Sequence, residues 1–409
     1  MFQSSSIAEK VTGKLSDNRS AQEDRRPLTV LQVIPRMDEG GAERGVMEIT
    51  EAIAREGGRA IIATSGGKML PRVPKAGGQV IAMNLETRNI LNLWQNARLL
   101  TRLIRDLEVD VVHARAAAPA WSAHLAAKRT GAHFVTTYHD TVSAAGLLGR
   151  RGKVMTRGQP VIAVSDFVRD QIIQQLGVSP DQVVTIPRGA DVNVFSEETV
   201  GNERAVKLAN EWGLLDDARP MVLLPDALTR TKGSEDLISA AQRLREMRGD
   251  DFLILLTGAE EGTSYEMGLR RTIEKMGLDD VVRVAASTGD SAAAYKLASV
   301  VVSASREPEA SCQPVIEAQA MGRPVIVTDH GAAPETVRHG DSGWLYPPGD
   351  VECLTDVLNK ALNLDPSQRA HMGMAARARI HSGYTLSAMQ RATLEVYEQV
   401  SGRTFAKLV

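Results

Sequence analysis

Two glutamates have residue types and a spacing that suit the binding of sugar and phosphate groups. Glu309 and Glu317 stand eight positions apart, and Pro308 and Pro314 interrupt regular structure beside them. Since proline is favoured at the first position of a helix, Glu309 is expected on a loop and Glu317 in the first turn of the helix after Pro314. The N–H groups of such a turn bind phosphate oxygens, and a carboxylate accepts hydrogen bonds from ribose hydroxyls. The other interpretation is a solvated loop acid and a partner of the helix dipole.

Basic residues form a second candidate site for phosphate. The run RPMVLLPDALTRTKGSEDLISAAQRL is typical of a strand, a loop and a helix that begins near Gly233. Lys232 supplies a point charge there and the helix supplies N–H donors, with Arg230 as a further cation. This order of elements predicts that phosphate oxygens bind where the loop meets the helix.

A pair of glycines precedes the first predicted helix. The apolar run LTVLQVIP indicates a buried strand, and Gly40 and Gly41 separate it from a helical stretch that starts near Ala42. Glycines let a backbone approach a ligand closely, and the helix would direct its positive end at that ligand. Two glycines in this position are otherwise a tight turn.

Polar residues follow other predicted strands of the first half. Short apolar runs alternate with helical stretches, one of them near residues 91–107, which predicts a parallel sheet with helices on both faces. His113, Arg115 and His139 lie at the ends of such strands, where sheets of this kind bind ligands. A histidine that closes a strand is otherwise a hydrogen-bonded structural residue.

The segment around the two glutamates resembles the donor site of glycosyltransferase family 4, whose members are retaining enzymes of the GT-B fold. The family signature is Glu, seven residues, Glu, a helix and a Gly-x-Pro-Val-Ile strand, which Glu309, Glu317 and residues 322–326 match. The resemblance runs with gaps from about Leu28 to Tyr397. It implies an α/β protein with two doubly wound, Rossmann-like domains that face a central cleft.

The resemblance also implies roles for individual residues. Glu317 would hold the ribose, Glu309 would touch the donor sugar or its phosphate, and His139 would lie near the anomeric carbon. His139 and Glu309 are therefore the catalytic candidates. The residues assigned to donor binding are Gly40, Gly41, Arg230, Lys232, Gly258, Val315, Ile316 and Glu317. Those assigned to the acceptor side are His113, Arg115 and Asp140.

The chain departs from the family pattern at three places. Ala227 stands where relatives commonly have the arginine that clamps the diphosphate, and Asp226 precedes it. Ser311 to Gln313 replace a usual Phe-Gly-Arg, and Asp140 replaces a glycine after the histidine. Losing one charge-assisted hydrogen bond weakens donor binding about ten- to a hundredfold. The departures indicate an altered donor, weakened catalysis or a degenerate protein that binds without transferring.

Bulk composition limits the partners and the compartment. The chain has 409 residues and a net charge of -2, which suits two domains and argues against nucleic acid as a partner. Two cysteines are too few for a disulfide framework, so a reducing cytoplasm is expected. We find no Asp-x-Asp motif, no His/Cys cluster and no apolar run long enough to span a bilayer. Neither a metal ion nor another cofactor is expected, since the nucleotide sugar is a substrate.

The predicted organisation has four parts. Residues 1–26 form a disordered tail and 27–200 a Rossmann-like domain on the acceptor side. Residues 201–384 form the nucleotide-sugar-binding domain, and 385–409 a helix that crosses back to the first domain. In SAAGLLGRRGKVMTRG, Leu147, Leu148, Val154 and Met155 alternate with basic residues. This pattern is either a peripheral contact with the inner face of the cytoplasmic membrane or a plain surface helix.

These features together predict a retaining glycosyltransferase of the hexosyltransferase kind. Its donor would be a nucleoside-diphosphate sugar, UDP-linked, and its acceptor a glycan or lipid-linked molecule of the cell envelope, as in lipopolysaccharide or polysaccharide biosynthesis. Two rivals remain open. One is a non-catalytic sugar-nucleotide-binding scaffold of the same fold, and the other is an epimerase acting on the free sugar nucleotide.

Overall fold

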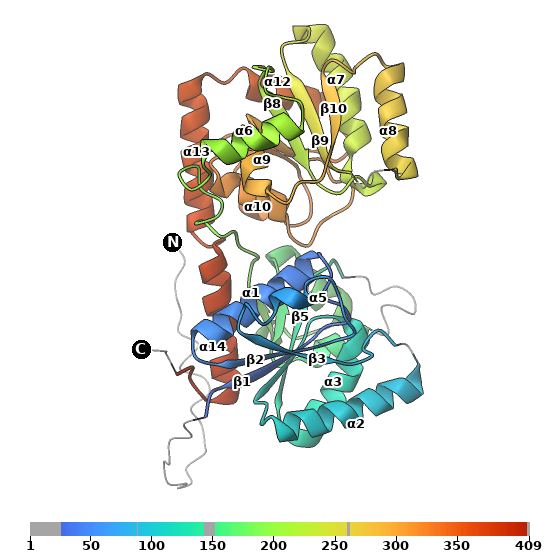
Figure 1. The fold of residues 1–409 in the computed structure, drawn as a ribbon, viewed down its shortest axis with the longest axis vertical. Helices are drawn as coiled ribbons and strands as arrows, with labels where there is room; N and C mark the ends of the chain where they lie inside the picture. Colours follow the sequence, from blue (N-terminus) through green and yellow to red (C-terminus); the bar gives the residue numbers. More distant parts are fainter. Residues whose placement is uncertain (1–25, 88, 143–151, 260–261, 407–409) are drawn as a thin grey trace.

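Two α/β domains make up the protein, one above the other in Figure 1. The structure is a computed structural model that describes residues 26–87, 89–142, 152–259 and 262–406. Each domain is built on one sheet, and every strand pair within the two sheets is parallel. The predicted doubly wound fold is confirmed.

The first domain has a seven-stranded sheet in the order β3-β2-β1-β4-β5-β6-β7. Its strands are β1 (Thr29–Val33), β2 (Arg59–Thr64), β3 (Gly78–Ala82), β4 (Val111–Ala114), β5 (His133–Tyr138), β6 (Val161–Ala163) and β7 (Val183–Thr185). Its helices are α1 (Gly41–Arg55), α2 (Ile90–Asp106), α3 (Ala117–Thr130) and α5 (Asp166–Leu176), with short 3-10 turns η2 (Leu70–Arg72), η3 (Lys153–Arg157) and η4 (Pro180–Gln182). Successive side chains of β1 point to opposite faces of the sheet, and helices cover both faces. Val30 packs in the cluster that contains residues of α1, whereas Leu31 packs in the cluster that contains residues of α2 and α3.

The second domain repeats the design with six strands in the order β10-β9-β8-β11-β12-β13. The strands are β8 (Met221–Pro225), β9 (Leu253–Ala259), β10 (Val282–Ala286), β11 (Val300–Ser303), β12 (Val325–Thr328) and β13 (Gly343–Tyr346). Its helices are α6 (Asn202–Glu211), α7 (Ser234–Arg248), α8 (Ser264–Lys275), α9 (Ser291–Leu297), α10 (Gln313–Ala320), α11 (Ala333–Thr336), α12 (Val351–Leu362) and α13 (Pro366–His381), with the 3-10 turn η5 (Arg230–Lys232). The apolar side chains of Val222 and Leu223 again face opposite layers, so each sheet is covered on both sides.

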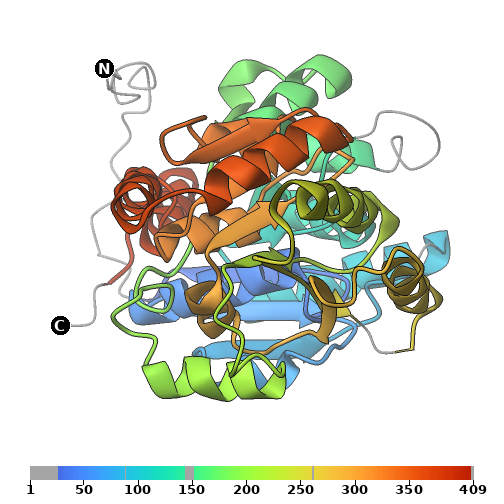
Figure 2. The same ribbon diagram turned by 90° about the horizontal axis from the view of Figure 1, so that it is seen from above.

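The last helix, α14 (Leu386–Ser401), packs on the first domain although it follows the second in sequence. Figures 1 and 2 show α13 and α14 in red along one side of the molecule. At the crossing, Ala190 N–H donates to the Tyr384 carbonyl and Leu386 N–H donates to the Ala190 carbonyl. A Cβ on Gly189 would lie 2.3 Å from the Thr385 backbone, so a glycine is needed where the two crossing segments meet.

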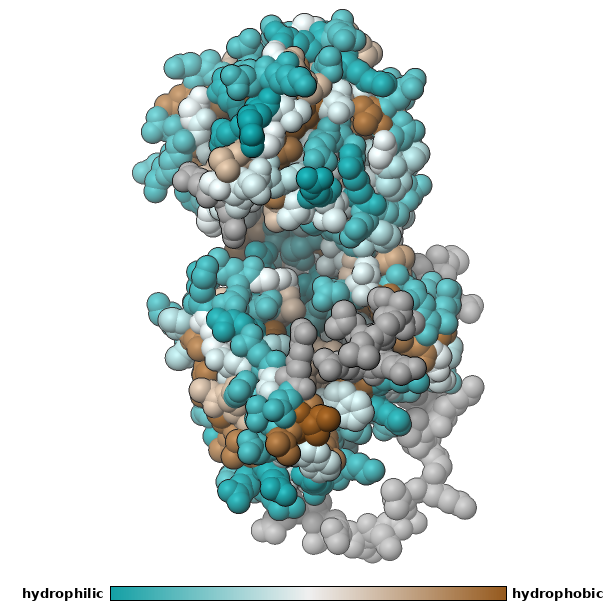
Figure 3. Space-filling model, turned by 90° about the vertical axis from the view of Figure 1, so that its right-hand side faces the viewer, coloured by the Kyte–Doolittle hydropathy of each residue, from teal (hydrophilic) through white to brown (hydrophobic). Residues whose placement is uncertain are grey.

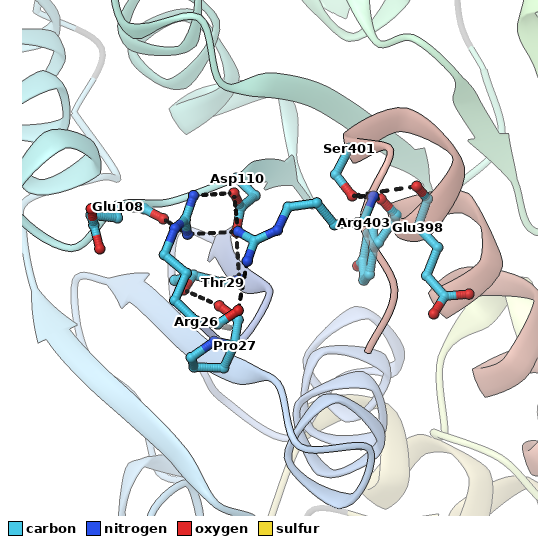
Figure 4. A network of polar contacts seen from close by, with 9 residues as sticks. Arg26, Pro27, Thr29, Glu108, Asp110, Glu398, Ser401 and Arg403 are labelled. Carbon is cyan, nitrogen blue, oxygen red and sulfur yellow. Dashed lines mark hydrogen bonds and ion pairs between the residues drawn. The ribbon is translucent and has the colours of Figure 1, made fainter. Parts of the chain in front are cut away.

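Asp110 fastens the segment after α14 to the first domain (Figure 4). Its carboxylate accepts hydrogen bonds from Arg26 at 2.8 Å, from the Thr29 N–H at 2.8 Å and from Arg403 at 3.0 Å. Burial raises the pKa of this carboxyl, but the three donors outweigh that effect and leave the pKa below its usual value. Arg26, which the sequence analysis placed in the tail, is therefore held in the fold.

Candidate active site

A cleft of about 1150 Å³ lies between the two domains. It is lined by the loops after β1 and β5 of the first sheet and after β8, β9, β10 and β11 of the second, which are the carboxyl ends of those strands. Figure 3 shows the recess between the domains from one side. Ligands of proteins with parallel α/β sheets bind at this edge, in the crevice beyond the carboxyl ends of the strands. We call this space the inter-domain cleft.

The Gly-Gly loop forms one wall of the cleft. Gly40 precedes the first turn of α1, which has no side-chain cap, and Gly41 begins that helix. A Cβ on Gly41 would meet nothing within 4 Å, so the backbone here borders open space. The N–H groups of the first helical turn are thus placed to receive an anionic group.

Lys232 lies on the opposite wall between two carboxylates. Its Nζ is 2.8 Å from Asp226 Oδ2 and 2.6 Å from Glu309 Oε1, and the Ser305 hydroxyl also donates to Glu309. Gly258 lies beside this group with a positive φ of 91°, and a Cβ there would be 2.3 Å from the Asp226 carbonyl oxygen. The close approach therefore requires glycine.

The charges of this cluster bear directly on phosphate binding. Burial lowers the pKa of Lys232, but attraction to Asp226 and Glu309 outweighs it and raises the pKa above its ordinary value. Burial raises the pKa of Asp226, and Lys232 only partly opposes that rise. With all three groups charged, two carboxylates face one ammonium, and the cluster carries one negative charge.

Glu317 lies in α10 and is buried, with three partners. Its Oε1 accepts from Arg44 of the first domain at 2.9 Å and from Gln313 at 3.1 Å, and its Oε2 accepts from the Tyr295 hydroxyl at 3.1 Å. Burial raises the pKa of Glu317, opposed first by Arg44. Glu317 is the fifth residue of its helix, so it lies in the second turn and not in the predicted first turn. Arg44 forms a bridge across the cleft that sequence reasoning missed.

His139 borders the cleft directly after β5, with Asp140 beside it at the surface. The Nε2 atom of His139 is buried and has no hydrogen-bond partner among the described residues. Burial, followed by the positive charges of Arg115 and Arg188, holds the pKa of His139 well below its ordinary value. The imidazole is therefore neutral at physiological pH and has a free nitrogen next to the cleft.

Arg188 is the second cleft residue that the sequence analysis did not assign to the site. It comes from the segment IPRGAD, is buried, and its Nη2 lies 3.0 Å from Glu48 Oε2 in α1. A Cβ on Gly45 would come within 2.4 Å of the Arg188 guanidinium and 2.9 Å of that of Arg115. The helix therefore leaves space for two arginines beneath His139. The segment IPRGAD resembles the corresponding segment of the family, and this resemblance could have assigned Arg188 to the cleft.

Other predicted residues lie away from the cleft lining. His113 is fully buried, with Nδ1 2.6 Å from the Tyr397 hydroxyl and Nε2 2.7 Å from Thr137 Oγ1, so both ring nitrogens are occupied. This placement does not support an acceptor contact by its side chain; His113 instead joins α14 to the first sheet. Arg115 lies behind it, 3.4 Å from His113 Nδ1.

The predicted donor residues of α10 are also placed differently from expectation. The side chains of Val315 and Ile316 belong to apolar clusters, and both N–H groups donate to the Cys312 carbonyl at 3.0 Å. Arg230 is exposed and does not line the cleft, whereas Lys232 does. Phosphate contacts by Val315 and Ile316 would require these N–H groups to change partners.

The segment at residues 143–158, predicted to be either a basic membrane face or a plain surface helix, is only partly described, since 143–151 lie outside the described residues. Val154 and Met155 are buried in the core of the first domain. Their predicted exposure was wrong, because the apolar side of η3 packs on α3 and β5. Among the described helices, none combines the length and hydropathy needed to cross a bilayer. The described residues also contain no group of three or more His, Cys, Asp or Glu side chains placed to hold a metal ion.

Two Rossmann-like domains that share a cleft at the carboxyl ends of both sheets define the GT-B class. Residues 39–194 match the family described as Glycosyltransferase Family 4, and residues 210–379 match the family described as Glycosyl transferases group 1. The chain therefore belongs to the GT-B family of glycosyltransferase enzymes, as the resemblance implied.

Three relatives illustrate the similarity. An MMP alpha-(1->4)-mannosyltransferase of Mycolicibacterium hassiacum is 27% identical over 263 residues, which are 64% of this chain and 59% of the relative. A solved glycosyltransferase of Rickettsia africae superimposes with a TM-score of 0.85 at 29% identity, covering 91% of this chain and 98% of that one. Anabaena HepE, solved with UDP and glucose, gives a TM-score of 0.77 at 21% identity, covering 90% and 98%.

Proposed function

We propose that this protein is a retaining glycosyltransferase whose donor is a UDP-linked sugar and whose acceptor is a glycan or lipid-linked molecule of the cell envelope. The observation that carries the proposal is the inter-domain cleft, in which Lys232 and Glu309 on one domain face the Gly40-Gly41 loop of the other. The UDP and glucose bound to HepE support the choice of donor class. The acceptor class rests on the family resemblance.

The donor would lie along the second domain. Its diphosphate would meet Lys232, and its ribose hydroxyls would donate to the Glu317 carboxylate in place of Arg44. The sugar would then reach the Gly-Gly loop, where the N–H groups of the first turn and the positive end of α1 favour negative charge, opposed by the acidic Glu43 of the same turn. Each proposed contact uses a residue that lines the same cleft.

Transfer with retention places bond breaking and bond forming on one face of the sugar. The bond from the anomeric carbon to the phosphate oxygen breaks, the acceptor oxygen bonds to that carbon, and its proton passes to the leaving phosphate. Neutral His139 would hold a sugar hydroxyl through its free ring nitrogen, and Glu309 would steady the sugar or phosphate. Cations of the chain and helix N-termini would meet the leaving charge, so we expect transfer to persist in EDTA.

Calorimetry with UDP, UDP-sugars and GDP-sugars tests donor binding, and mass spectrometry of envelope extracts incubated with the bound donor tests transfer. We expect one donor class to bind and a glycosylated product to form. No binding by any nucleotide sugar would overturn the proposal. Formation of an epimer of the donor without acceptor would instead identify an epimerase.

A non-catalytic sugar-nucleotide-binding scaffold is the second candidate. It is favoured by the ion pair between Asp226 and Lys232, because the lysine already has a partner. The arginine that relatives commonly have after the position of Asp226 is also absent. Donor binding without transfer or donor hydrolysis, unchanged by Ala227→Arg, would support the scaffold. Recovery of transfer on Ala227→Arg would identify a weakened enzyme.

For the cellular setting we propose the cytoplasm, with peripheral contact at the inner face of the membrane where a lipid-linked acceptor would be presented. We do not propose a nucleic acid as a partner of this protein. Fractionation of cells into soluble and membrane pools, with and without high salt, tests it. Recovery of the whole protein outside the cytoplasm would contradict it.

A further inference from the structure

Two arginines are buried close together in the first domain, beside the inter-domain cleft. Arg115 directly follows β4 and Arg188 follows β7, and each is 5% exposed. Gly45 of α1 lies against both, because a Cβ there would be 2.4 Å from Arg188 Nη1 and 2.9 Å from Arg115 Nη2. Burying two like charges is unfavourable unless each one has a partner of opposite charge. We call Arg115 and Arg188 the arginine pair.

One acid, Glu48 of α1, balances one of the two charges. Its Oε2 lies 3.0 Å from Arg188 Nη2, but neither atom forms a hydrogen bond, so the ion pair is poorly aligned. Burial raises the pKa of Glu48, opposed first by Arg188. Burial lowers the pKa of Arg115 to about 10, so this guanidinium is still protonated at neutral pH. With Glu48 ionised, the three groups together carry one positive charge.

The surrounding side chains do not neutralise this charge. Burial holds the pKa of His113 and of His139 well below the ordinary value, so both rings are neutral at physiological pH. Tyr397 is also neutral, because burial raises the pKa of its hydroxyl. Arg44 and Glu317 form an ion pair with each other and add no net charge. The positive charge of the arginine pair therefore has no counterpart among these neighbours.

Hydrogen-bonding capacity is unused at the same place. Arg115 Nε, Arg188 Nη2 and His139 Nε2 are buried and have no hydrogen-bond partner among the described residues. The Nη1 atom of Arg188 contacts the sulfur of Met389 at 3.7 Å, and sulfur is a weak acceptor. Buried donors nearly always have partners in folded proteins. Because Arg188 and His139 line the cleft, a ligand in the cleft can supply the missing acceptor.

We propose that the arginine pair binds an anionic substituent of the substrate, a carboxylate or a phosphate, carried by the transferred sugar or by the acceptor. Arg188 would contact this group directly, since a guanidinium matches carboxylate and phosphate oxygens with two parallel hydrogen bonds. Arg115 would add its charge from behind, where the low dielectric of the interior strengthens the attraction. This inference rests on the proposed function and names the class of substrate within it, an acidic one.

The position of Arg188 favours such a substituent over the donor diphosphate. Lys232 lines the cleft from the second domain, whereas Arg188 lines it from the first. A donor whose diphosphate meets Lys232 directs its sugar toward His139 and Arg188. The acceptor enters from the same side, because it must reach the anomeric carbon of that sugar.

Calorimetry that compares an acidic ligand with its neutral counterpart tests the inference. One arm compares UDP-glucuronic acid with UDP-glucose, and the other compares glucose 6-phosphate with glucose, with and without UDP. We expect the acidic ligand to bind about tenfold tighter or more in one arm, which is the gain from one charge-assisted hydrogen bond. The arm that shows this preference identifies whether the donor or the acceptor carries the anion.

Variants then assign the preference to the arginine pair. Arg188→Gln should bring the ratio of acidic to neutral affinity close to one, and Arg188→Lys should retain part of it, because the charge remains without the planar fork. Glu48→Gln should raise the ratio severalfold, since it removes the competing acid. Arg219→Gln is the matched control, because Arg219 pairs with Asp217 away from the cleft, and it should leave the ratio unchanged. Thermal melting checks each fold, and Glu48→Gln decides alone if Arg188→Gln does not fold.

Two results would overturn the inference and leave the proposed function intact. The first is equal affinity for acidic and neutral ligands in both arms, while UDP-glucose binds. The second is an Arg188→Gln variant that weakens UDP as much as the acidic ligand, because Arg188 would then meet the diphosphate. Failure of every UDP compound to bind would instead end the proposed function. The arm without UDP would still decide on the arginine pair, since a preference for glucose 6-phosphate supports it and no preference overturns it.

Discussion

Asp226 and Lys232 form an ion pair inside the inter-domain cleft, with 2.8 Å between Oδ2 and Nζ. The lysine that is best placed to meet a diphosphate is thus already engaged, and Glu309 holds it from the other side. A bound diphosphate would have to compete with both carboxylates for one ammonium group. Donor affinity in this protein should therefore rise when Asp226 loses its negative charge or its ion pair with Lys232.

Asp226→Asn should tighten the binding of UDP about tenfold. The amide keeps the shape of the side chain but removes one negative charge near the diphosphate and frees Lys232 for a charge-assisted hydrogen bond. Isothermal calorimetry at pH 7.5 measures the change. Asp279→Asn, on the exposed surface of the same domain, is the control. Weaker binding in Asp226→Asn would mean that Asp226 orients the lysine for the donor.

Ala227→Arg should also tighten donor binding, by about ten- to a hundredfold. Ala227 is exposed and borders the cleft, so an arginine there has room to extend toward the diphosphate. The same calorimetric titration checks the prediction. Ala218→Arg, at another exposed site of the second domain, should have no such effect. If Ala227→Arg bound UDP with the same affinity as the unaltered chain, the diphosphate would lie elsewhere.

Glu317→Gln should weaken donor binding about tenfold or more while the fold persists. The amide still fits beside Tyr295 and Gln313, but the ribose would lose an ionised acceptor. Arg44→Gln should have the opposite sign, because it removes the competitor for the carboxylate. Thermal melting checks the fold, and Glu274→Gln on the exposed side of α8 is the control. Equal affinities for Glu317→Gln and the unaltered chain would exclude Glu317 as the ribose ligand.

Stability should fall as the pH drops below about 6.5, and His113 should contribute to that loss. Burial, and then the charge of Arg115, lower the pKa of His113 well below 6.5. Below that pH the unfolded chain binds a proton at His113 that the folded chain does not bind. The free energy of unfolding therefore falls by up to about 1.4 kcal/mol per pH unit.

Urea unfolding at pH 7.5 and pH 5.5 measures this dependence. His113→Gln should lower the stability at both values and reduce its dependence on pH, since the titrating group is gone. His133→Gln, at an exposed position, should leave the dependence unchanged. An unchanged slope in His113→Gln would show that another group causes the loss, with His139 the next candidate.

The sequence was a good guide wherever local patterns decide the structure. The helix expected near residues 91–107 spans Ile90–Asp106, and Glu309 lies on a loop as predicted. These features depend on apolar periodicity and on proline placement, which act within a few residues. The parallel arrangement followed from the alternation of short apolar runs with helices.

Contacts between distant segments could not be predicted in the same way. Arg44 and Glu317 are 273 positions apart and meet only because the two domains are docked. The burial of Val154 and Met155 depends on how η3 lies against α3 and β5, which their own alternation with basic residues does not reveal. His113 matched a family segment, yet its ring is occupied by Tyr397 of α14.

The return of α14 means that the first domain is not one continuous piece of polypeptide. A fragment ending near residue 200 would leave bare the apolar surface that Met389, Val396 and Tyr397 cover. Such a fragment should be recovered in soluble form only when residues 382–409 are supplied as a separate peptide or joined through a short artificial connection. During synthesis, the first domain cannot complete its core until α14 has left the ribosome.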